Sequence, residues 1–315
     1  MLVLFVGTSF GCASRKAPTI TPLSARDREV FFSRAQDERR FWLTRYESDF
    51  GPVFTGGNRV HADRFARVEF QGRRDSTVPA LVVRMRGAQE YTALLDTSAR
   101  ANWVEFGLSE REGIIPIGPP PHRLFPAHVR DAVPGYLSVV SRLVINGLHV
   151  DTALVYVKAA HGPLDILKRD LKMDVPLILG GDFIRAFHFV QIDFPNRTIL
   201  FSTTNPYKPD AERLIAQVPL RDYFGIFVLE GYIDGMETLF ALDSLGEFAL
   251  ASNLDLPSHA RQVMIGDLVL RNVAHTDVET LALGIPDLPR IGGHVLNRFI
   301  VTFDTRQRIA YFERP

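Results

Sequence analysis

The second half of the chain repeats a pattern found in the first half. Residues 179–187 read LGGDFIRAF and residues 291–299 read IGGHVLNRF, so each has an apolar residue, a Gly pair, a short helical stretch and a Phe. Each motif continues into a strand that carries an Asp, Asp193 in one copy and Asp304 in the other, followed by a turn and a last strand. Agreement in this order predicts a duplicated fold built from two similar units.

A second pair of matching motifs lies upstream of the first pair. Residues 91–99 read YTALLDTSA and residues 238–246 read TLFALDSLG, so each is an apolar strand that ends in Asp and a hydroxyl residue. Another strand and a turn precede each copy. Val, Leu, Ile and Phe dominate these segments, with Gly, Asn and Asp in the turns between them, which is typical of β-structure. The sequence therefore predicts a mainly β protein with two tandem lobes.

The N-terminal residues 1–13, MLVLFVGTSFGCA, combine a short apolar stretch, small residues and the only cysteine, Cys12. This segment resembles a bacterial lipoprotein signal peptide, in which the cysteine is lipidated after cleavage. The resemblance implies a lipid anchor to a membrane surface, in an outer-membrane lipoprotein of the bacterial envelope that faces the periplasm. The alternative is an apolar N-terminus with an incidental cysteine. A single cysteine excludes disulfides within the chain and thiolate metal cages.

Residues 24–50 are densely charged and carry aromatic residues at roughly helical spacing. Ser24 is a suitable N-cap, with Asp27 in the acidic first turn. We expect an amphipathic N-terminal helix that packs on the main body, in preference to a membrane-surface helix, because acidic residues interrupt its basic face. The predicted organisation has five parts: signal and tether 1–23, helical segment 24–63, first lobe 64–204, linker 205–212 and second lobe 213–315.

Composition narrows the classes of function. Lys and Arg together number 36, as do Asp and Glu, so the formal net charge is zero and a general nucleic-acid binder is not expected. The nine histidines show no paired metal-ligand spacing, and the Gly pairs lack the spacing of phosphate-binding loops. We therefore expect no metal, no cofactor and no nucleic-acid partner.

From about residue 65 to residue 315, each half resembles a lobe of a retropepsin-like aspartic protease, and the tandem resembles the bilobed, pepsin-like arrangement. The resemblance implies that Asp96 and Asp243 are the catalytic pair, facing one another across a pseudo-twofold axis about a shared water. It implies that Thr97 and Ser244, together with Ser98, support this dyad, and that a peptide or protein substrate binds in the cleft between the lobes. Because two adjacent carboxylates do not ionise independently, one would hold a proton while the other acts as base.

Two features set this chain apart from the family pattern. The family has Gly after the Asp and hydroxyl residues, whereas this chain has Ser98 and Leu245, with Gly246 one position later. The Leu245 side chain either points away from the dyad or separates the carboxylates. These alternatives lead to two hypotheses: an envelope aspartic endopeptidase, or a catalytically inactive relative that binds a peptide or partner protein or serves as a scaffold in an envelope assembly.

The interval between the Asp motif and the Gly pair is much longer in the first half than in the second. This difference leaves room in the first lobe for a flap, the hairpin that closes over substrate in pepsin-like enzymes. Tyr136 is a candidate flap aromatic. The alternative is an ordinary strand aromatic.

Overall fold

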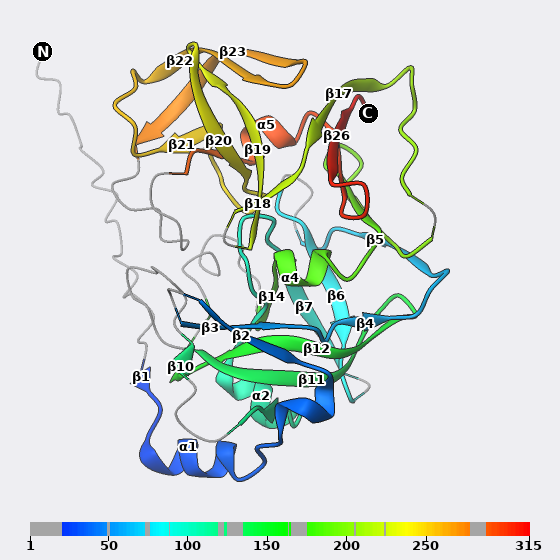
Figure 1. Ribbon diagram of the computed structural model, residues 1–315, viewed down its shortest axis with the longest axis vertical. Helices are drawn as coiled ribbons and strands as arrows, with labels where there is room; N and C mark the ends of the chain where they lie inside the picture. Colours follow the sequence, from blue (N-terminus) through cyan, green and yellow to red (C-terminus); the bar gives the residue numbers. More distant parts are fainter. Residues whose placement is uncertain are drawn as a thin grey trace, which may run out of the picture.

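The structure is a computed structural model, mainly β, in which two lobes are joined by a shared sheet (Figure 1). In Figure 1 the second lobe, yellow to orange, lies above the first, and the strands labelled β5, β17 and β26 of the shared sheet lie to one side. The structure describes residues 21–48, 51–72, 76–87, 89–118, 123–124, 135–162, 164, 175–204, 206–223, 225–277 and 288–315.

Six strands of the first lobe close into a barrel, in the order β11-β6-β7-β14-β8-β12, because β12 pairs back with β11. Within it β14 runs parallel to β7, and β8 runs parallel to β12. Closure leaves none of these six as a free edge over its paired length. The barrel strands are β6 (Ala80–Arg84), β7 (Glu90–Leu95), β8 (Trp103–Val104), β11 (Gly135–Ile145), β12 (Leu148–Lys158) and β14 (Leu177–Leu179); β4 (Arg59–Val60), β9 (Ile115–Pro116) and β10 (Arg123–Leu124) extend the sheet, and helix α2 (Phe106–Arg111) follows β8.

The second lobe contains the same barrel. Its order, β22-β19-β20-β24-β21-β23, closes when β23 pairs with β22, and its two parallel pairs, β20 with β24 and β21 with β23, occupy the corresponding places. The duplication read from the sequence is therefore present in strand order and in strand direction. The strands are β18 (Arg221–Tyr223), β19 (Ile226–Ile233), β20 (Met236–Leu242), β21 (Leu250–Ser252), β22 (His259–Ile265), β23 (Leu268–Asp277) and β24 (Arg290–Ile291).

A six-stranded antiparallel sheet joins the lobes, with three strands from each half in the symmetric order β17-β26-β25-β15-β16-β5. Its two central strands pair Gln191 with Thr302, which are equivalent positions of the repeat, and the Gln191 Nε2 donates to the Thr302 Oγ1 at 3.1 Å. The pseudo-twofold axis therefore passes between these two residues. The strands are β5 (Phe65–Glu69), β15 (Phe189–Asp193), β16 (Thr198–Ser202), β17 (Leu214–Pro219), β25 (Ile300–Asp304) and β26 (Ile309–Glu313).

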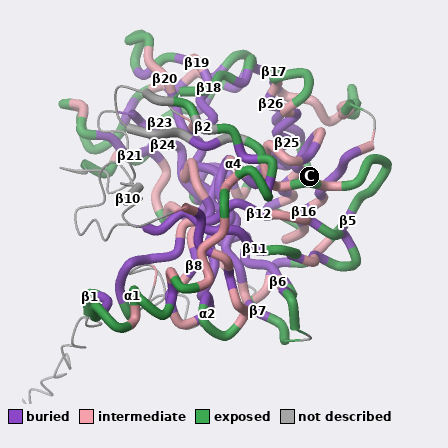
Figure 2. Tube along the Cα trace, turned by 60° about the horizontal axis from the view of Figure 1, so that its bottom comes forward, coloured by how far each residue is buried: buried purple, intermediate pink, exposed green. Residues whose placement is uncertain are grey.

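One hydrophobic core runs through both barrels and the shared sheet, and buried segments fill the centre of the molecule in Figure 2. It includes Leu81 of the first barrel, Phe240 of the second, and Phe201 and Phe303 of the shared sheet, none more than 1% exposed. Burying one such side chain contributes roughly 1.5–3 kcal/mol. Because the core is continuous, the lobes pack as one body around the axis.

Each Gly pair sits where two chain segments nearly touch. A Cβ on Gly180 would lie 2.5 Å from the carbonyl oxygen of Ala101, and a Cβ on Gly292 would lie 2.5 Å from that of Phe248. Glycine is required at both positions because no side chain fits against the facing backbone. The short helices α4 (Gly181–Ile184) and α5 (Gly293–Leu296) begin directly after these close approaches.

The N-terminal segment differs from the predicted helix over much of its length. Helix α1 (Ala25–Phe32) begins at the Ser24 N-cap, where Ser24 and Asp27 form a capping box, but the helix ends after eight residues. The prediction that 24–63 is a helical segment is wrong beyond this point. A 3-10 helix η1 (Glu38–Phe41), strands β2 (Thr44–Ser48) and β3 (Gly51–Thr55), and β4 follow instead.

Tertiary packing accounts for this difference. Trp42, at the end of η1, has φ 54°, which interrupts a right-handed helix. Phe41 and Phe54 then pack in a small buried cluster with residues of β11 and β12, while β4 pairs with β12. Helix α1 also lies on the first lobe, through Phe31. Among the described residues, no helix has both the length and the apolar character that crossing a membrane requires.

Candidate active site

Asp96 and Asp243 occupy equivalent positions at the ends of β7 and β20. The backbone N–H of Asp96 donates to the Leu179 carbonyl at 2.8 Å, and that of Asp243 donates to the Ile291 carbonyl at 2.8 Å. Each aspartate is thereby held against the strand that precedes the Gly pair of its own lobe. Their residues are only 4% and 3% exposed, so both carboxyl groups lie in the interior where the lobes meet.

The residues that follow the two aspartates exchange hydrogen bonds across the axis. The Thr97 N–H donates to Ser244 Oγ at 3.1 Å, and the Ser244 N–H donates to Thr97 Oγ1 at 3.2 Å. Each hydroxyl then donates to a carbonyl of the opposite lobe, Thr97 to Leu242 at 2.5 Å and Ser244 to Leu95 at 2.6 Å. These four buried bonds fix the two aspartate-bearing turns relative to each other.

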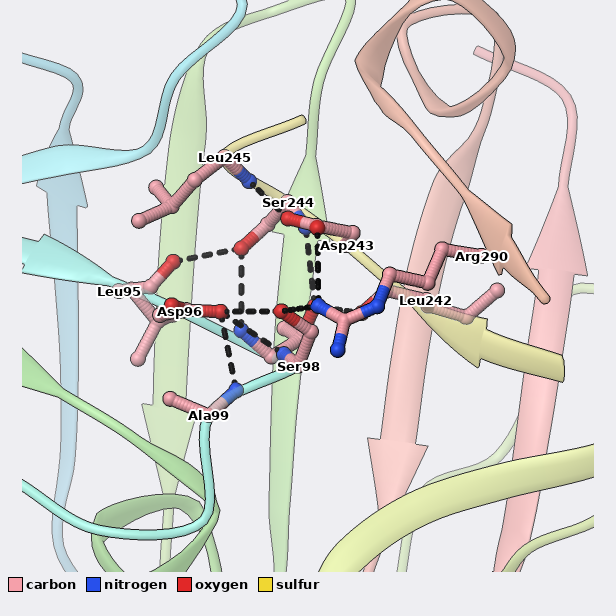
Figure 3. A network of polar contacts seen from close by, with 10 residues as sticks. Leu95, Asp96, Ser98, Ala99, Leu242, Asp243, Ser244, Leu245 and Arg290 are labelled. Carbon is pink, nitrogen blue, oxygen red and sulfur yellow. Dashed lines mark hydrogen bonds and ion pairs between the residues drawn. The ribbon is translucent and has the colours of Figure 1, made fainter. Parts of the chain in front are cut away.

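The two carboxyl groups have different surroundings (Figure 3). Asp96 Oδ1 accepts three hydrogen bonds, from the Ser98 N–H at 2.9 Å, the Ser98 hydroxyl at 2.8 Å and the Ala99 N–H at 3.0 Å. Asp243 Oδ1 accepts from the Leu245 N–H at 3.1 Å, and its Oδ2 lies 3.4 Å from Nη1 of Arg290. One carboxyl is therefore held by neutral donors, whereas the other also contacts a cation.

Arg290 is a site residue that the sequence prediction missed. It lies in β24, is 0% exposed, and its Nη1 donates both to Asp243 Oδ2 and, at 3.3 Å, to the Ser98 hydroxyl of the other lobe. A buried guanidinium is retained where an anion compensates its charge. The signal in the sequence is an arginine two residues before the Gly pair, at the position that Ile178 occupies in the first half.

The Leu245 side chain points away from both carboxyl groups (Figure 3). It is 4% exposed and packs in a buried apolar cluster with residues of the first lobe. Of the two outcomes expected for this residue, the structure has the first: the Leu245 side chain points away from the dyad and packs against residues of the other lobe. The other buried members of the cluster are Val78, Ala80, Leu94, Val175 and Ile178.

Burial and the adjacent charge of Asp243 raise the pKa of Asp96 to about 6, while the hydrogen bonds from Ser98 and the charge of Arg290 act in the opposite direction. Below this pH, Asp96 carries a proton and can act as a general acid. The carboxyl group beside it, on the opposite lobe, is placed to act as a base. A protonated carboxyl beside a second carboxyl that can accept a proton is an arrangement suited to activating water against a carbonyl group.

Tyr136 lies in β11 and is 7% exposed. Its ring packs against α1, with ring centroids 4.9 Å from Phe32 and 5.9 Å from Phe31. The structure therefore places it as an ordinary strand aromatic, the alternative to the flap residue. Cys12 and the predicted lipoprotein signal lie outside the described residues.

Two further observations on the described residues concern a metal site and a cavity. No three His, Cys, Asp or Glu side chains among them are grouped to hold a metal ion. A cavity of about 610 Å³, bordered by Arg185, Asp222 and Arg306 among others, includes neither aspartate of the pair.

No model of a protein family matches the chain, and no curated protein matches it. Any function must therefore be argued from the site itself.

Proposed function

We propose that this protein is a pepsin-like aspartic endopeptidase that hydrolyses peptide bonds with Asp96, Asp243 and a water held between them. The observation that carries the proposal is the placement of two buried aspartates, one from each lobe, on equivalent turns locked by the reciprocal bonds of Thr97 and Ser244. Such locking holds the two carboxyl groups in fixed relation, as acid–base catalysis by a pair requires.

The pair performs two tasks in the reaction. The ionised carboxylate takes a proton from water as the water oxygen bonds to the peptide carbonyl carbon, and the protonated carboxyl gives its proton to the carbonyl oxygen. The tetrahedral intermediate collapses when the leaving nitrogen is protonated and the C–N bond breaks, giving a carboxylic acid and an amine. Neither group alone performs both tasks, so the two titrate and act as a unit.

The proposed substrate is a peptide in extended conformation that lies between the lobes. An extended chain pairs its backbone with strand edges, and its alternate side chains enter pockets on either side. The two aspartates directly follow their barrel strands, β7 and β20, and this supports the proposal that the substrate reaches them at the lobe junction.

A second candidate function is peptide binding without cleavage. Its support is the guanidinium of Arg290, which lies against Asp243 in the interior, together with the absence of the family glycine at Leu245. In this alternative the site holds a peptide or a partner protein, and the aspartates stabilise the lobe junction.

The test uses the full-length protein and a denatured-protein peptide library, scanned from pH 3 to pH 8 with cleavage sites read by mass spectrometry. Asp96→Asn and Asp243→Asn should each reduce cleavage by at least about 10³-fold, because residues that act as a unit fail together. Asp267→Asn, at an exposed turn of the second lobe, is the matched control and should leave cleavage unchanged. Retained cleavage in either dyad variant would overturn the proposal, and binding without cleavage by the wild type would favour the second candidate.

We also propose that Cys12 is lipidated and anchors the protein in the bacterial envelope. One acyl-modified terminus attaches a folded body to a membrane surface without a spanning helix. Cys12→Ser should move the protein from the membrane fraction to the soluble fraction, and an unchanged distribution would contradict the anchor.

A further inference from the structure

The pseudo-twofold symmetry relates two pairs of residues near the dyad. Each pair joins the residue two places before the Gly pair of one lobe to the residue two places after the aspartate of the other lobe. The residue two places before the Gly pair is Ile178 in the first lobe and Arg290 in the second. The residue two places after the aspartate is Ser98 in the first lobe and Leu245 in the second. Across the lobe junction, Ile178 and Leu245 belong to one buried apolar cluster, whereas Arg290 donates to the Ser98 hydroxyl.

The two equivalent pairs therefore differ in kind. Ile178 and Leu245 are both apolar, whereas Ser98 and Arg290 are a hydroxyl and a buried cation joined by a hydrogen bond. The cation contacts the aspartate of its own lobe, Asp243, at 3.4 Å, while the residue at the equivalent position of the first lobe is the uncharged Ile178. A guanidinium beside a carboxyl group favours its ionised form.

We propose that Arg290 is a positioning residue that holds Asp243 as the carboxylate and thereby leaves the single proton of the pair on Asp96. This inference rests on the proposed function only for its catalytic consequence. In the reaction, Asp243 takes the proton of the attacking water and Asp96 gives its proton to the peptide carbonyl oxygen. As the C–N bond breaks, Asp243 passes its proton to the nitrogen, and Asp96 recovers a proton from a hydroxyl of the intermediate.

The hydrogen-bond directions fit this assignment. Because a guanidinium only donates, the Ser98 hydroxyl accepts from Arg290 and turns its own hydrogen toward Asp96 Oδ1. That oxygen also accepts two backbone N–H groups, so it is fully used as an acceptor. The proton of Asp96 is therefore placed on Oδ2, and Arg290 selects this oxygen through Ser98.

The charges around the two aspartates also favour ionisation of Asp243 before Asp96. Burial and the charge of Asp243 raise the pKa of Asp96 to about 6. The charged groups that act on Asp96 among the described residues are Asp243, which raises its pKa, and Arg290, which lowers it. Since Arg290 contacts Asp243 directly and reaches Asp96 through Ser98, its charge favours ionisation of Asp243 first.

The test follows the carboxyl groups by NMR in full-length protein labelled with ¹³C at the aspartate carboxyl carbon, with Asp96→Asn and Asp243→Asn used for assignment. In the wild type, Asp96 should be the later carboxyl of the pair to ionise as the pH rises. Arg290→Gln retains hydrogen-bond donors and removes the charge, so the titration of Asp243 should move up by about one pH unit or more. Arg290→Lys keeps the charge and should preserve the wild-type order.

Control variants distinguish the effect of removing the Arg290 charge from the effect of damaging the fold. Arg306→Gln, at an exposed arginine in the turn between β25 and β26, should leave both titrations unchanged. If Arg290→Gln does not fold, the comparison of Ser98→Ala with the wild type decides, because loss of the hydroxyl should shift the titration of Asp96 while Asp243 remains ionised first. The inference is overturned if Asp243 is the later group in the wild type, if folded Arg290→Gln leaves the titration of Asp243 unchanged, or, where that variant does not fold, if Ser98→Ala leaves the titration of Asp96 unchanged.

The NMR experiment needs no substrate, so its result is independent of peptide cleavage. If the wild type cleaves nothing at any pH, the proposed function fails while the role of Arg290 is still decided by the titrations. If cleavage occurs, Arg290→Gln should move both limbs of the bell-shaped pH profile to higher pH, because removing a cation raises both apparent ionisations of the pair.

Discussion

Thr97 and Ser244 each place a side-chain oxygen against the other's backbone N–H, at 3.2 Å and 3.1 Å, across the junction of the two lobes. Both residues are only 1% exposed, so water cannot replace these bonds if one partner is removed. The exchange links the two aspartate-bearing turns directly, and it makes the geometry of the dyad depend on both halves of the chain.

Thr97→Val should destabilise the protein by roughly 2–4 kcal/mol, because it leaves the buried Ser244 N–H and Leu242 carbonyl without their hydroxyl partner. Urea unfolding followed by circular dichroism measures the change. Thr97→Ser keeps the hydroxyl and should lose less than half as much stability. Equal stability of Thr97→Val and the wild type would show that the exchange does not hold the lobes.

Asp96→Asn should make the protein more stable than the wild type at pH 7. The pKa of Asp96 in the folded state, about 6, lies above its ordinary value of 3.8, so the folded state favours the protonated carboxyl. This stabilisation is fully present below pH 3.8 and is lost as the pH rises through about 6. An amide stays neutral, so the advantage of the Asn variant should grow from pH 4 to pH 7, to at most roughly 3 kcal/mol.

Urea unfolding at pH 4, 5, 6 and 7 measures this pH dependence for the wild type and Asp96→Asn. Asp267→Asn, at an exposed turn, is the control and should follow the wild-type curve at every pH. A constant difference between Asp96→Asn and the wild type would contradict the raised pKa.

Leu245→Ala should lower the free energy of unfolding by roughly 2–4 kcal/mol, because it leaves a cavity in the apolar cluster beside Ile178. The carboxyl groups do not rest on this side chain, so any peptidase activity per folded molecule should fall by less than about threefold. Thermal unfolding and peptide cleavage measure the two quantities. Leu245→Met conserves volume and should cost less than about 1.5 kcal/mol; a large loss of activity in that variant would assign Leu245 a role at the dyad.

The duplicated β-architecture and the positions of the two aspartates follow from the repeat in the sequence. Each copy carries its own strand pattern, its Asp with a hydroxyl residue and its Gly pair. Each of these features specifies structure within its own lobe. Gly180 and Gly292 show the reason: each is required by a close approach of backbone within its own lobe, so the repeat preserves both. Ser24 and Asp27 likewise specify where α1 begins, since a capping box involves only neighbouring residues.

The surroundings of the two aspartates, in contrast, depend on contacts between residues far apart in the sequence. Arg290 contacts Ser98, which lies almost two hundred residues earlier in the chain, and Leu245 packs against residues of the opposite lobe. A local sequence pattern therefore predicts neither contact. The helix expected through residue 50 ends at Phe32 because Phe41 and Phe54 pack against strands that lie about a hundred residues later. Helix periodicity is a local preference, and burial against distant strands overrode it because removing large apolar side chains from water contributes more free energy than helix propensity does.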